Sequence, residues 1–349
     1  MPPVMEEVSS VDAVFLAGGQ GTRLHPLTET LPKPMVPVAN QPWLDRLAAS
    51  CRAQGVTRIL CTACHRWEVI RDHFHGRGLD EWISLILEAE PLGTGGAIRN
   101  AALGLKEPFL VFNADVVSSA DLAALYRFHL EKGAAVTIAL TPVSDPSPYG
   151  VVDLAPDGRI RRFVEKPRRE EAPSNYINAG IYVFDPRVLD MIPAGRAVSV
   201  ERETFPGLIE AGLPVYGFPV VGYWNDLGTP AGYLQVHRDI LQGRAAIPLP
   251  GRRQGGGWVG EDVVIERGAR LVPPFVLGDG CRVEKGAQVG PWAVLGPRVR
   301  VGERARLQDT VVWADAIVGD GVSLERAVVG YGAVVEDERA AAVGVMVRC

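Results

Sequence analysis

The sequence predicts an α/β protein: a doubly wound, mostly parallel sheet followed by a left-handed parallel β-helix of hexapeptide repeats. Three observations predict it: an apolar strand that leads into a glycine-rich turn, apolar runs that alternate with helical patterns, and a six-residue period in the last third of the chain. The chain has 349 residues, which is long enough for two domains with buried cores. It is 47% hydrophobic and 22% charged, as is ordinary for a globular protein. We expect an α/β domain over residues 1–245, then a linker and the β-helix over residues 246–349.

Short apolar runs alternate with helical patterns in the first 140 residues or so. This alternation implies strand–helix–strand units and a mostly parallel sheet, in which ligands bind beyond the carboxyl ends of the strands. Gly18, Glu88 and Asp115 all follow such strand ends. The expected strands are Ala13–Ala17, Arg58–Ala63, Ile83–Leu87, Phe109–Phe112 and Ala135–Leu140, and the expected helices are Pro42–Gln54, Glu68–Phe74, Gly96–Leu105 and Ser119–Lys132.

The pattern then changes to longer strands and hairpins. The pair Asp157-Gly158 between alternating runs is a strong hairpin signal. Thr229 and Pro230 are typical of an N-cap and a first helical residue, so we expect a helix from there to about Gln242. These insertions would wall off a second pocket. The other expected elements are a hairpin over Tyr149–Pro167, strands over Asn175–Phe184 and Val215–Trp224, and a linker over Gly243–Gly257.

An internal repeat begins at Val259. Aliphatic residues recur every six positions, and small or apolar residues stand four positions further on. This is the hexapeptide signature of a parallel β-helix, in which each coil buries its aliphatic residue against the next. The aliphatic positions are Val259, Ile265, Leu271, Leu277, Val283, Val289, Leu295, Val301 and Leu307, then, after five-residue steps, Val312, Val318 and Leu324, and Val329 and Val335.

The glycine-rich turn after the first strand contains Gly18, Gly19 and Gly21, and the cations Arg23 and Lys33 follow it. Glycine allows positive φ and lets a ligand approach the backbone closely, and successive N–H groups form an anion site. The turn therefore predicts a polyphosphate site. The alternative is a tight strand–helix turn with two surface cations.

Two familiar phosphate motifs do not fit this turn: no Lys-Ser or Lys-Thr follows the glycines, and Leu24 stands where a dinucleotide fingerprint needs its last glycine. The run over residues 18–28, continued by Pro32-Lys33-Pro34, instead resembles the signature G-G-x-G-T-R-L-x-P-L-T with P-K-P of sugar-1-phosphate nucleotidyltransferases. The resemblance implies a Rossmann-like catalytic domain. It also implies nucleotide binding by Leu16, Ala17, Gly18, Gly19, Gly21, Thr22 and Arg23.

Two carboxylates, Asp115 and Asp226, end apolar strands. Such an acid either caps the next helix or holds a hard cation, and Ser118 and Ser119 near Asp115 leave the cap open as an alternative. The resemblance favours the cation, because the family's N-A-D and W-x-D-x-G-T contexts bind Mg²⁺ and match these two aspartates. We therefore expect Asp115 and Asp226 to be the metal ligands.

The block that begins at Glu88 reads E-A-E-P-L-G-T-G-G. A carboxylate there could accept hydrogen bonds from guanine N1–H and N2–H₂, and the glycines permit close approach to a flat base. The alternative is that Glu88 and Glu90 are solvated loop acids. The block resembles E-P-L-G-T-(A/G)-G of the guanylyltransferases that act on mannose 1-phosphate, so Glu88, Gly93 and Thr94 are expected to bind the nucleotide.

A sugar pocket is implied by further resemblance to the same family. V-E-K-P assigns Lys166 to the sugar phosphate and Glu165 to sugar hydroxyls, and the run over residues 192–206 also looks like the bacterial GDP-mannose-forming members. The alternative is that these are ordinary hairpin and strand residues. The expected sugar-binding residues are Asn113, Gly150, Glu165, Lys166, Asn178 and Trp224.

The activity implied is Mg²⁺-dependent guanylyl transfer from GTP to mannose 1-phosphate, by in-line attack of the sugar phosphate on the α-phosphate. Positioning and charge stabilisation would suffice, with Arg23, Lys33, Lys166 and Asp115 as catalytic residues. Thymidylyl or uridylyl transfer to glucose 1-phosphate stays an alternative, as do heptose or N-acetylhexosamine phosphates and a catalytically silent regulatory subunit. An acyltransferase is excluded, because no histidine follows His237 to act as base in the β-helix.

Charge and cysteine content limit the partners and the compartment. The net charge of −5 with interspersed signs argues against nucleic acid, and no apolar run approaches the roughly twenty residues of a membrane span. The first ten residues lack a basic leader, and five scattered cysteines are expected to be free thiols, so we expect a cytoplasmic protein. We interpret the haem-like spacing Cys61-x-x-Cys64-His65 as chance. The β-helix suggests a homo-oligomer.

Overall fold

The computed structural model describes residues 11–336 and 346–347. The described residues form two compact units: one holds those up to Gly19 with Arg46–Trp224, and the other holds Gln20–Asp45 with those from Asn225 onward. The second unit therefore combines a segment of the glycine-rich signature with the C-terminal repeats. The expected division into consecutive domains, residues 1–245 and residues 246–349, stays a prediction.

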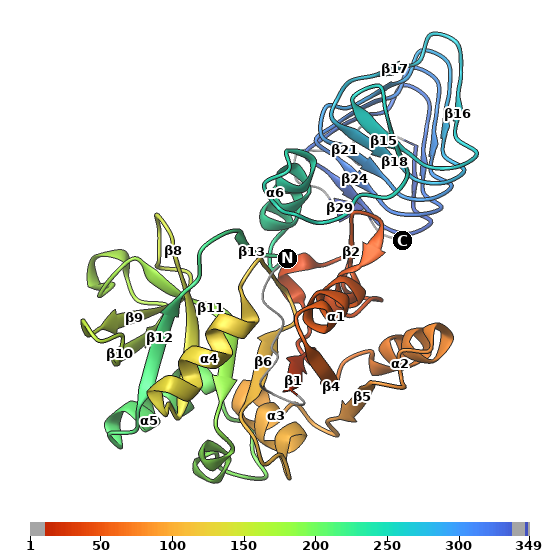
Figure 1. The fold of residues 1–349 in the computed structure, drawn as a ribbon. Coiled ribbons are helices and arrows are strands. Elements are labelled where there is room, and N and C mark those ends of the chain that lie inside the picture. The colour runs from red at the N-terminus through yellow and green to blue at the C-terminus, as the bar shows by residue number, and fades with distance from the viewer. Residues whose placement is uncertain (1–10, 337–345, 348–349) are drawn as a thin grey trace. The chain divides into compact units, whose positions relative to one another are not determined.

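The first unit is built on a nine-stranded sheet whose centre is parallel. Its order is β10-β9-β11-β6-β1-β4-β5, with β8 beside β11 and β12 beside β8. Strands β6, β1, β4 and β5 run parallel, and β11 is antiparallel to β6 (Figure 1). The strands are β1 (Val11–Leu16), β4 (Val56–Ala63), β5 (Ile83–Leu87), β6 (Phe109–Asn113), β8 (Val136–Pro142), β9 (Gly150–Leu154), β10 (Ile160–Glu165), β11 (Tyr176–Phe184) and β12 (Val215–Pro219).

Helices cover both faces of this sheet. Val136 and Ile138 of β8 share a buried cluster with Ile98 of α3. Thr137 lies between them in sequence, and its hydroxyl is 3.0 Å from His129 Nδ1 on α4. Because successive side chains of a strand point to opposite faces, α3 and α4 lie on opposite sides, which confirms the doubly wound prediction. The helices are α1 (Trp43–Ala53), α2 (Trp67–Arg77), α3 (Gly93–Ala102), α4 (Leu122–Lys132), α5 (Phe205–Glu210) and α6 (Pro230–Leu241).

His129 makes the stability of this layer dependent on pH. Burial lowers its pKa from 6.5 to about 4, with Asp185 raising and Arg187 lowering it to smaller extents. On acidification, the imidazole of residue 129 is protonated in the unfolded chain before it is protonated in the folded chain. The contribution of neutral His129 to the free energy of unfolding is therefore intact above about pH 6.5 and is lost as the pH falls to about 4. At about 1.4 kcal/mol per pKa unit, we expect a loss of roughly 3 kcal/mol in the free energy of unfolding. Urea titrations at several pH values would measure it.

His129→Gln is the matched variant for this measurement, because it removes the titrating group from the same position. We expect its stability to fall less steeply than that of the parent chain over the same pH range. An identical loss in both proteins would mean that other groups cause the acid sensitivity.

The strand expected over Val215–Trp224 is interrupted, so that prediction is wrong for its second half. Strand β12 ends at Pro219, and the separate strand β13 is Trp224–Asp226. Between them Gly222 has a φ of 125°, and a Cβ there would lie 2.3 Å from Ser119 Oγ. The break therefore depends on a close approach between residues about a hundred positions apart, which the alternation of apolar residues does not reveal.

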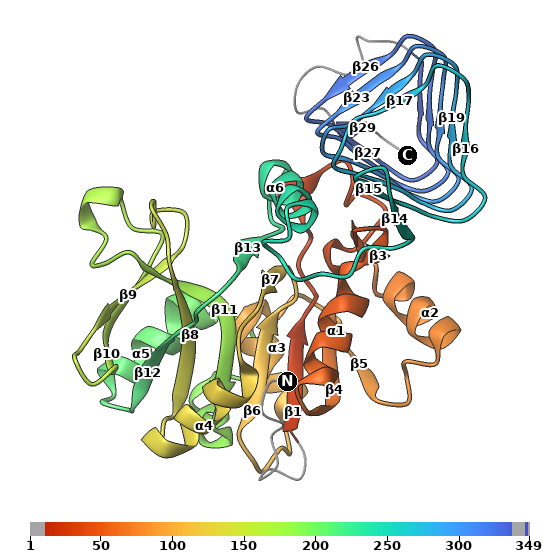
Figure 2. The ribbon, with the colours of Figure 1, turned by 45° about the horizontal axis from the view of Figure 1, so that its top comes forward.

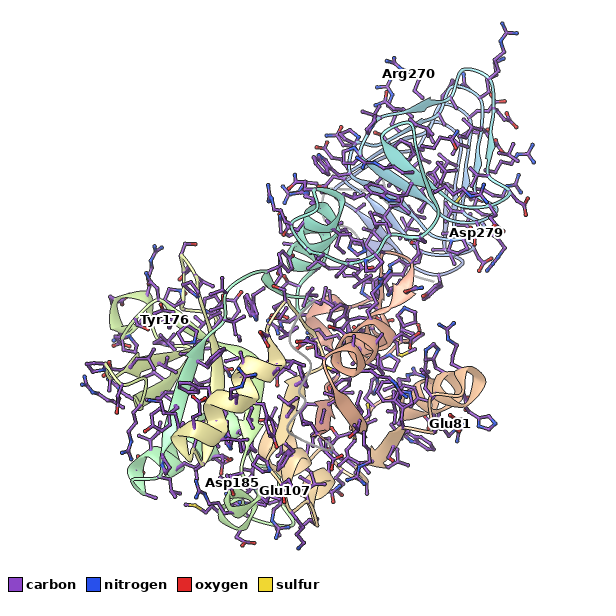
Figure 3. All side chains as sticks on the ribbon, in the orientation of Figure 1. Glu81, Glu107, Tyr176, Asp185, Arg270 and Asp279 are labelled. Carbon is purple, nitrogen blue, oxygen red and sulfur yellow. The ribbon has the colours of Figure 1, made fainter. Side chains whose placement is uncertain are left out.

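The C-terminal repeats form the β-helix that the period predicts. Three sheets of parallel strands repeat every three strands along the chain, and Figure 2 shows them as the sides of the coil stack. The expected aliphatic residues from Leu277 to Val335 are buried, whereas Ile265 in the first coil is 41% exposed, so the expected burial is wrong there. Arg270 and Asp279 stand on the outside of the coils (Figure 3). The sheets are β15-β18-β21-β24-β27-β29, β16-β19-β22-β25-β28 and β17-β20-β23-β26. The stack is of the kind that builds left-handed β-helices.

The strands of this stack are short. They are β15 (Gly257–Val259), β16 (Val264–Ile265), β17 (Arg270–Leu271), β18 (Phe275–Leu277), β19 (Arg282–Val283), β20 (Gln288–Val289), β21 (Ala293–Leu295), β22 (Arg300–Val301), β23 (Arg306–Gln308), β24 (Val311–Val312), β25 (Ile317–Val318), β26 (Ser323–Glu325), β27 (Val328–Val329), β28 (Val334–Val335) and β29 (Met346–Val347). The expected linker is not wholly irregular, because β14 (Arg252–Gln254) pairs with β15 as a hairpin.

The expected helix start at Thr229 is confirmed, since its side chain accepts a hydrogen bond from Gly232 N–H and Pro230 is the first residue of α6. Cys51, Cys61, Cys64 and Cys281 are free, as expected, while Cys349 and the acidic first ten residues lie outside the described residues. No helix in the described part of the chain is long and apolar enough to cross a bilayer.

Candidate functional site

The glycine-rich turn begins where β1 ends in the first unit. Ala17 N–H donates to Thr62 O, which extends the β1–β4 pairing by one residue. A Cβ on Gly18 would lie 3.5 Å from Glu88 Oε1 and 3.6 Å from the backbone N of Cys64, whereas a Cβ on Gly19 would meet nothing within 4 Å. Gly19 is exposed. The backbone at Gly19 is therefore open for a ligand to approach.

The rest of the turn packs on the Lys33 segment within the second unit. Gly21 has a φ of 65°, and a Cβ there would lie 3.1 Å from the Cβ of Lys33. The hydroxyl of Thr28 donates to Gly21 O over 2.8 Å. Thr22 and Arg23 follow in the short helix η1 (Thr22–Leu24) and are exposed. The third glycine is thus required both by its conformation and by the close approach of the chain.

Arg23, Lys33 and Asp226 lie together in the second unit. Lys33 is only 8% exposed, and its Nζ is 3.8 Å from Asp226 Oδ1. Gly228 N–H donates to the same Oδ1 over 2.6 Å, and a Cβ on Gly228 would lie 2.7 Å from either carboxylate oxygen and 2.9 Å from Arg23 Nη2. Burying a cation is costly unless it is paired. The structure therefore brings three predicted site residues into one charged cluster.

Glu88 is not a solvated loop acid, which excludes that alternative for it. The residue follows β5 and is 9% exposed, and its Oε2 accepts a hydrogen bond from Leu92 N–H over 2.9 Å. Burial raises its pKa, and the bond from Leu92 opposes that rise. A carboxylate has about four acceptor positions, so the bond to Leu92 leaves capacity for a ligand donor.

The glycines that follow Glu88 admit the backbone of a second segment. Gly93 has a φ of 67°, and a Cβ on it would lie 2.6 Å from Val198 O. The hydroxyl of Thr94 donates to Glu201 Oε2 over 2.9 Å and accepts from Val200 N–H over 2.8 Å. The side chain of Thr94 is therefore used to hold the 198–201 segment. Nucleotide binding by Gly93 and Thr94 stays a prediction.

Asn178 and Asn113 form a polar group at the centre of the sheet. Asn178 Nδ2 donates to Tyr182 OH over 2.8 Å, and its Oδ1 accepts from Gly180 N–H over 2.9 Å. The buried Oδ1 of Asn113 has no hydrogen-bond partner among the described residues. A buried acceptor without a partner costs free energy, so Asn113 has an acceptor to offer a ligand hydroxyl.

Glu165, Lys166 and Gly150 meet at the open end of the β9–β10 hairpin. A Cβ on Gly150 would lie 2.4 Å from Phe163 Cζ and 3.0 Å from Glu165 Oε2, so only glycine fits. Lys166 has a φ of 50°, and its Nζ is 3.7 Å from Glu165 Oε1. Burial raises the pKa of Glu165, Glu201 raises it further, and Lys166 lowers it. This end of the hairpin therefore combines a constrained cation with a carboxylate.

The positions of Trp224 and Asp115 show what each side chain does in the fold, and whether Asp115 caps the helix that follows it. Trp224 Nε1 donates to Ala179 O over 2.9 Å, next to Asn178. Asp115 lies between β6 and β7 (Val116–Ser118) and does not cap α4, because Asp121 does so by accepting from Ala124 N–H. Capping of α4 as the role of Asp115 is therefore excluded, and α4 begins at Leu122 rather than at the expected position three residues earlier.

Sequence reasoning missed Glu201 and Tyr182. Glu201 accepts from Thr94 and from the Ser199 hydroxyl, and with Glu165 it raises the pKa of the buried Tyr182 hydroxyl, although burial is the larger cause. Glu201 lies in the run over residues 192–206, whose sequence shows only a resemblance to the family. The sequence signal that could have indicated Glu201 is its position two residues after Ser199, which caps the short helix η5 (Val200–Thr204).

The fold and the charged glycine-rich turn define a nucleotidyltransferase, and comparison with known proteins agrees. The sequence profile described as "Nucleotidyl transferase" matches residues 12–243, so this chain belongs to that family. It is 41% identical over 276 residues to a mannose-1-phosphate guanylyltransferase of Mycobacterium tuberculosis, covering 78% of this chain and 76% of the relative. It is 37% identical to mannose-1-phosphate guanylyltransferase 1 of Arabidopsis thaliana, covering 78% of both chains.

Solved structures agree with this assignment. The crystal structure of HddC from Yersinia pseudotuberculosis matches with a TM-score of 0.58 and 30% identity, covering 66% of this chain and 99% of that one. The same protein complexed with GMP-PN matches equally well. A UDP-glucose pyrophosphorylase at 22% identity and a TM-score of 0.59, covering 67% of this chain and 99% of that one, shares the fold.

Proposed function

We propose that this enzyme transfers the guanylyl group of GTP to mannose 1-phosphate. A phosphate oxygen of the sugar phosphate attacks the α-phosphorus of GTP, the bond from that phosphorus to the bridging oxygen breaks, and GDP-mannose and pyrophosphate form. The observation that carries the transfer chemistry is the cluster of Arg23, Lys33 and Asp226. The choice of base and sugar is supported by the names of the relatives and by the buried carboxylate of Glu88. These relatives do not favour thymidylyl or uridylyl transfer, or a silent subunit.

Each cation is assigned by where negative charge lies during the reaction. Arg23 and the backbone N–H groups of residues 18–21 would hold the leaving pyrophosphate. Lys33, paired with Asp226 and barely exposed, would balance charge on the reacting phosphates, and Lys166 would bind the phosphate of the sugar. Catalysis by fixed charges of this kind needs no covalent intermediate on the enzyme.

A divalent cation, for which we propose Mg²⁺, fits the donor types present. Carboxylates and phosphate oxygens are the ligands that Mg²⁺ takes in such sites, and we propose Asp115 and Asp226 as its protein ligands. Bound there, the ion would neutralise charge on the phosphates. Asp226 is also held by Gly228 N–H and lies near Lys33, so this chain orients the carboxylate by itself.

The sugar would be recognised by the polar residues around β11. Asn113 offers its buried acceptor to a hydroxyl, and Glu165 is held beside Gly150 to accept from others. Trp224 donates to Ala179 O, the residue after Asn178. Assembly into a homo-oligomer through the β-helix and a cytoplasmic location both stay predictions.

The test is a pyrophosphate-release assay with GTP, ITP, ATP, UTP and dTTP, each paired with mannose 1-phosphate or glucose 1-phosphate. We expect GTP with mannose 1-phosphate to give the highest kcat/KM and GDP-mannose as product. ITP lacks the guanine N2 amino group and should be about tenfold poorer, because one hydrogen bond to Glu88 is lost. Absence of pyrophosphate release with every pair would favour a silent subunit.

Glu88→Gln is the variant that links base choice to this carboxylate. The amide keeps an acceptor for Leu92 N–H but presents one acceptor fewer, so the preference for GTP over ITP should shrink to about twofold. Thr57→Val, remote from the turn on β4, is the control and should keep the parent's preference. An unchanged preference in Glu88→Gln would remove Glu88 from base recognition.

A further inference from the structure

The hairpin that follows Lys33 is held by hydrogen bonds to other parts of the second unit. Helix η2 (Lys33–Met35) leads directly into β2 (Pro37–Val38), which pairs with β3 (Gln41–Pro42). The turn between them places Ala39 and Asn40 at φ values of 47° and 66°. Two consecutive non-glycine residues in this conformation are costly and persist only where surrounding contacts hold them.

Two buried side chains of α6 supply such contacts. Ala39 N–H donates to His237 Nε2 over 3.2 Å, and His237 Nδ1 lies 2.9 Å from Tyr233 O. The ring therefore accepts at Nε2 and donates from Nδ1. The Tyr233 hydroxyl donates to Pro37 O in a short hydrogen bond. Tyr233 is 1% exposed and His237 is 2% exposed, so water cannot replace these bonds.

The β-helix provides the next layer of contacts. Trp313 Nε1 donates to the Tyr233 hydroxyl over 3.0 Å, and Asn40 Nδ2 donates to Leu295 O over 2.8 Å. Arg238 of α6 forms a two-point ion pair with Asp309. A continuous set of hydrogen bonds thus runs from a coil of the β-helix, through α6, to the chain that carries Lys33.

We propose that Tyr233 is a positioning residue that sets the location of Lys33 for nucleotidyl transfer, with Trp313 of the β-helix holding Tyr233 in place. The proposal rests on the proposed function. The Tyr233 hydroxyl joins Trp313 to Pro37, and Lys33 is linked to Pro37 by a single helical turn closed by the bond from Val36 N–H to Lys33 O. Small displacements of a group that stabilises a transition state are costly in rate. The β-helix therefore takes part in catalysis through the loop it holds.

The test is a double-mutant cycle between Tyr233→Phe and Lys33→Gln, with kcat as the readout. Tyr233→Phe leaves Trp313 N–H and Pro37 O unpaired and should lower kcat by about tenfold in the parent chain. If Tyr233 acts through Lys33, the same change in the Lys33→Gln background should lower kcat by less than about twofold. Trp313→Phe, which removes the donor to the Tyr233 hydroxyl, serves as the second variant if Tyr233→Phe does not fold.

Tyr126→Phe is the matched control, because its buried hydroxyl also donates to a proline carbonyl, that of Pro108, in the first unit. It should destabilise the fold comparably and leave kcat unchanged. An equal loss of kcat from Tyr233→Phe in both backgrounds, or no loss in the parent, would overturn the positioning role while leaving the proposed function intact. If Lys33→Gln itself kept full activity, the catalytic role of Lys33 would fail, and the positioning role with it.

Discussion

Lys33→Gln is expected to lower kcat/KM for guanylyl transfer by about 10²–10³. The substitution removes a cation that the fold keeps 8% exposed and 3.8 Å from Asp226, and glutamine supplies no net positive charge to the reacting phosphates. Because the lost interaction acts on the transition state, most of the effect should fall on kcat rather than on KM. Steady-state kinetics with GTP and mannose 1-phosphate would measure it.

Arg298→Gln is the matched control for this variant. Arg298 is also a cation paired with an aspartate, Asp315, in the same unit, but the pair lies on the exposed surface of the β-helix. Exposed ion pairs contribute little, so we expect turnover and stability close to those of the parent chain. A loss in Arg298→Gln as large as that in Lys33→Gln would point to a general effect of charge. Full activity in Lys33→Gln would exclude Lys33 from the chemistry.

The elements that sequence predicts well are those defined by local periodicity. The six-residue spacing produces the β-helix because the coils from Leu277 onward repeat the same burial, and β5 is found at its expected bounds, Ile83–Leu87. Local patterns also place Thr229 as an N-cap. Such features depend on neighbours within a few positions, so the sequence carries them directly.

The features that sequence does not predict depend on contacts between distant residues. Tyr233 meets Pro37 across 196 positions and Trp313 across 80, so no window along the chain shows that the Lys33 segment groups with the β-helix. Gly93 stays a predicted nucleotide-binding residue, and its missing side chain also makes room for Val198 O, which the sequence does not show. A glycine in the sequence can indicate that another group approaches the backbone closely, but it does not identify that group.

The same argument applies to the acids. Residue type and strand-end position singled out Glu88, Asp115 and Asp226, because a carboxylate there is rarely needed for packing. Glu201 was missed because it lies in a short irregular helix and is defined by its bonds to Thr94 and Ser199. Its link to the start of α3 and its effect on the pKa of Glu165 can be identified only once the fold is known.

Asp115→Asn is expected to reduce kcat by about 10²–10³ and to raise the Mg²⁺ concentration needed for half-maximal rate. Asparagine keeps the size and one acceptor oxygen but removes the negative charge that makes a carboxylate a strong ligand for a hard cation. The two effects should appear together, since both come from weaker metal binding. The measurement is kcat as a function of Mg²⁺ concentration at saturating GTP and mannose 1-phosphate, with circular dichroism to confirm the fold.

Asp121→Asn provides the comparison that separates metal binding from folding. Asp121 lies six positions further on and caps α4 by accepting from Ala124 N–H, and asparagine caps as well as aspartate does. This variant loses the same charge from the same stretch of chain, so its rate and its Mg²⁺ dependence should match those of the parent. If Asp115→Asn behaved like Asp121→Asn, Asp115 would not be a metal ligand. The charge between β6 and β7 would then need a role outside the transfer reaction.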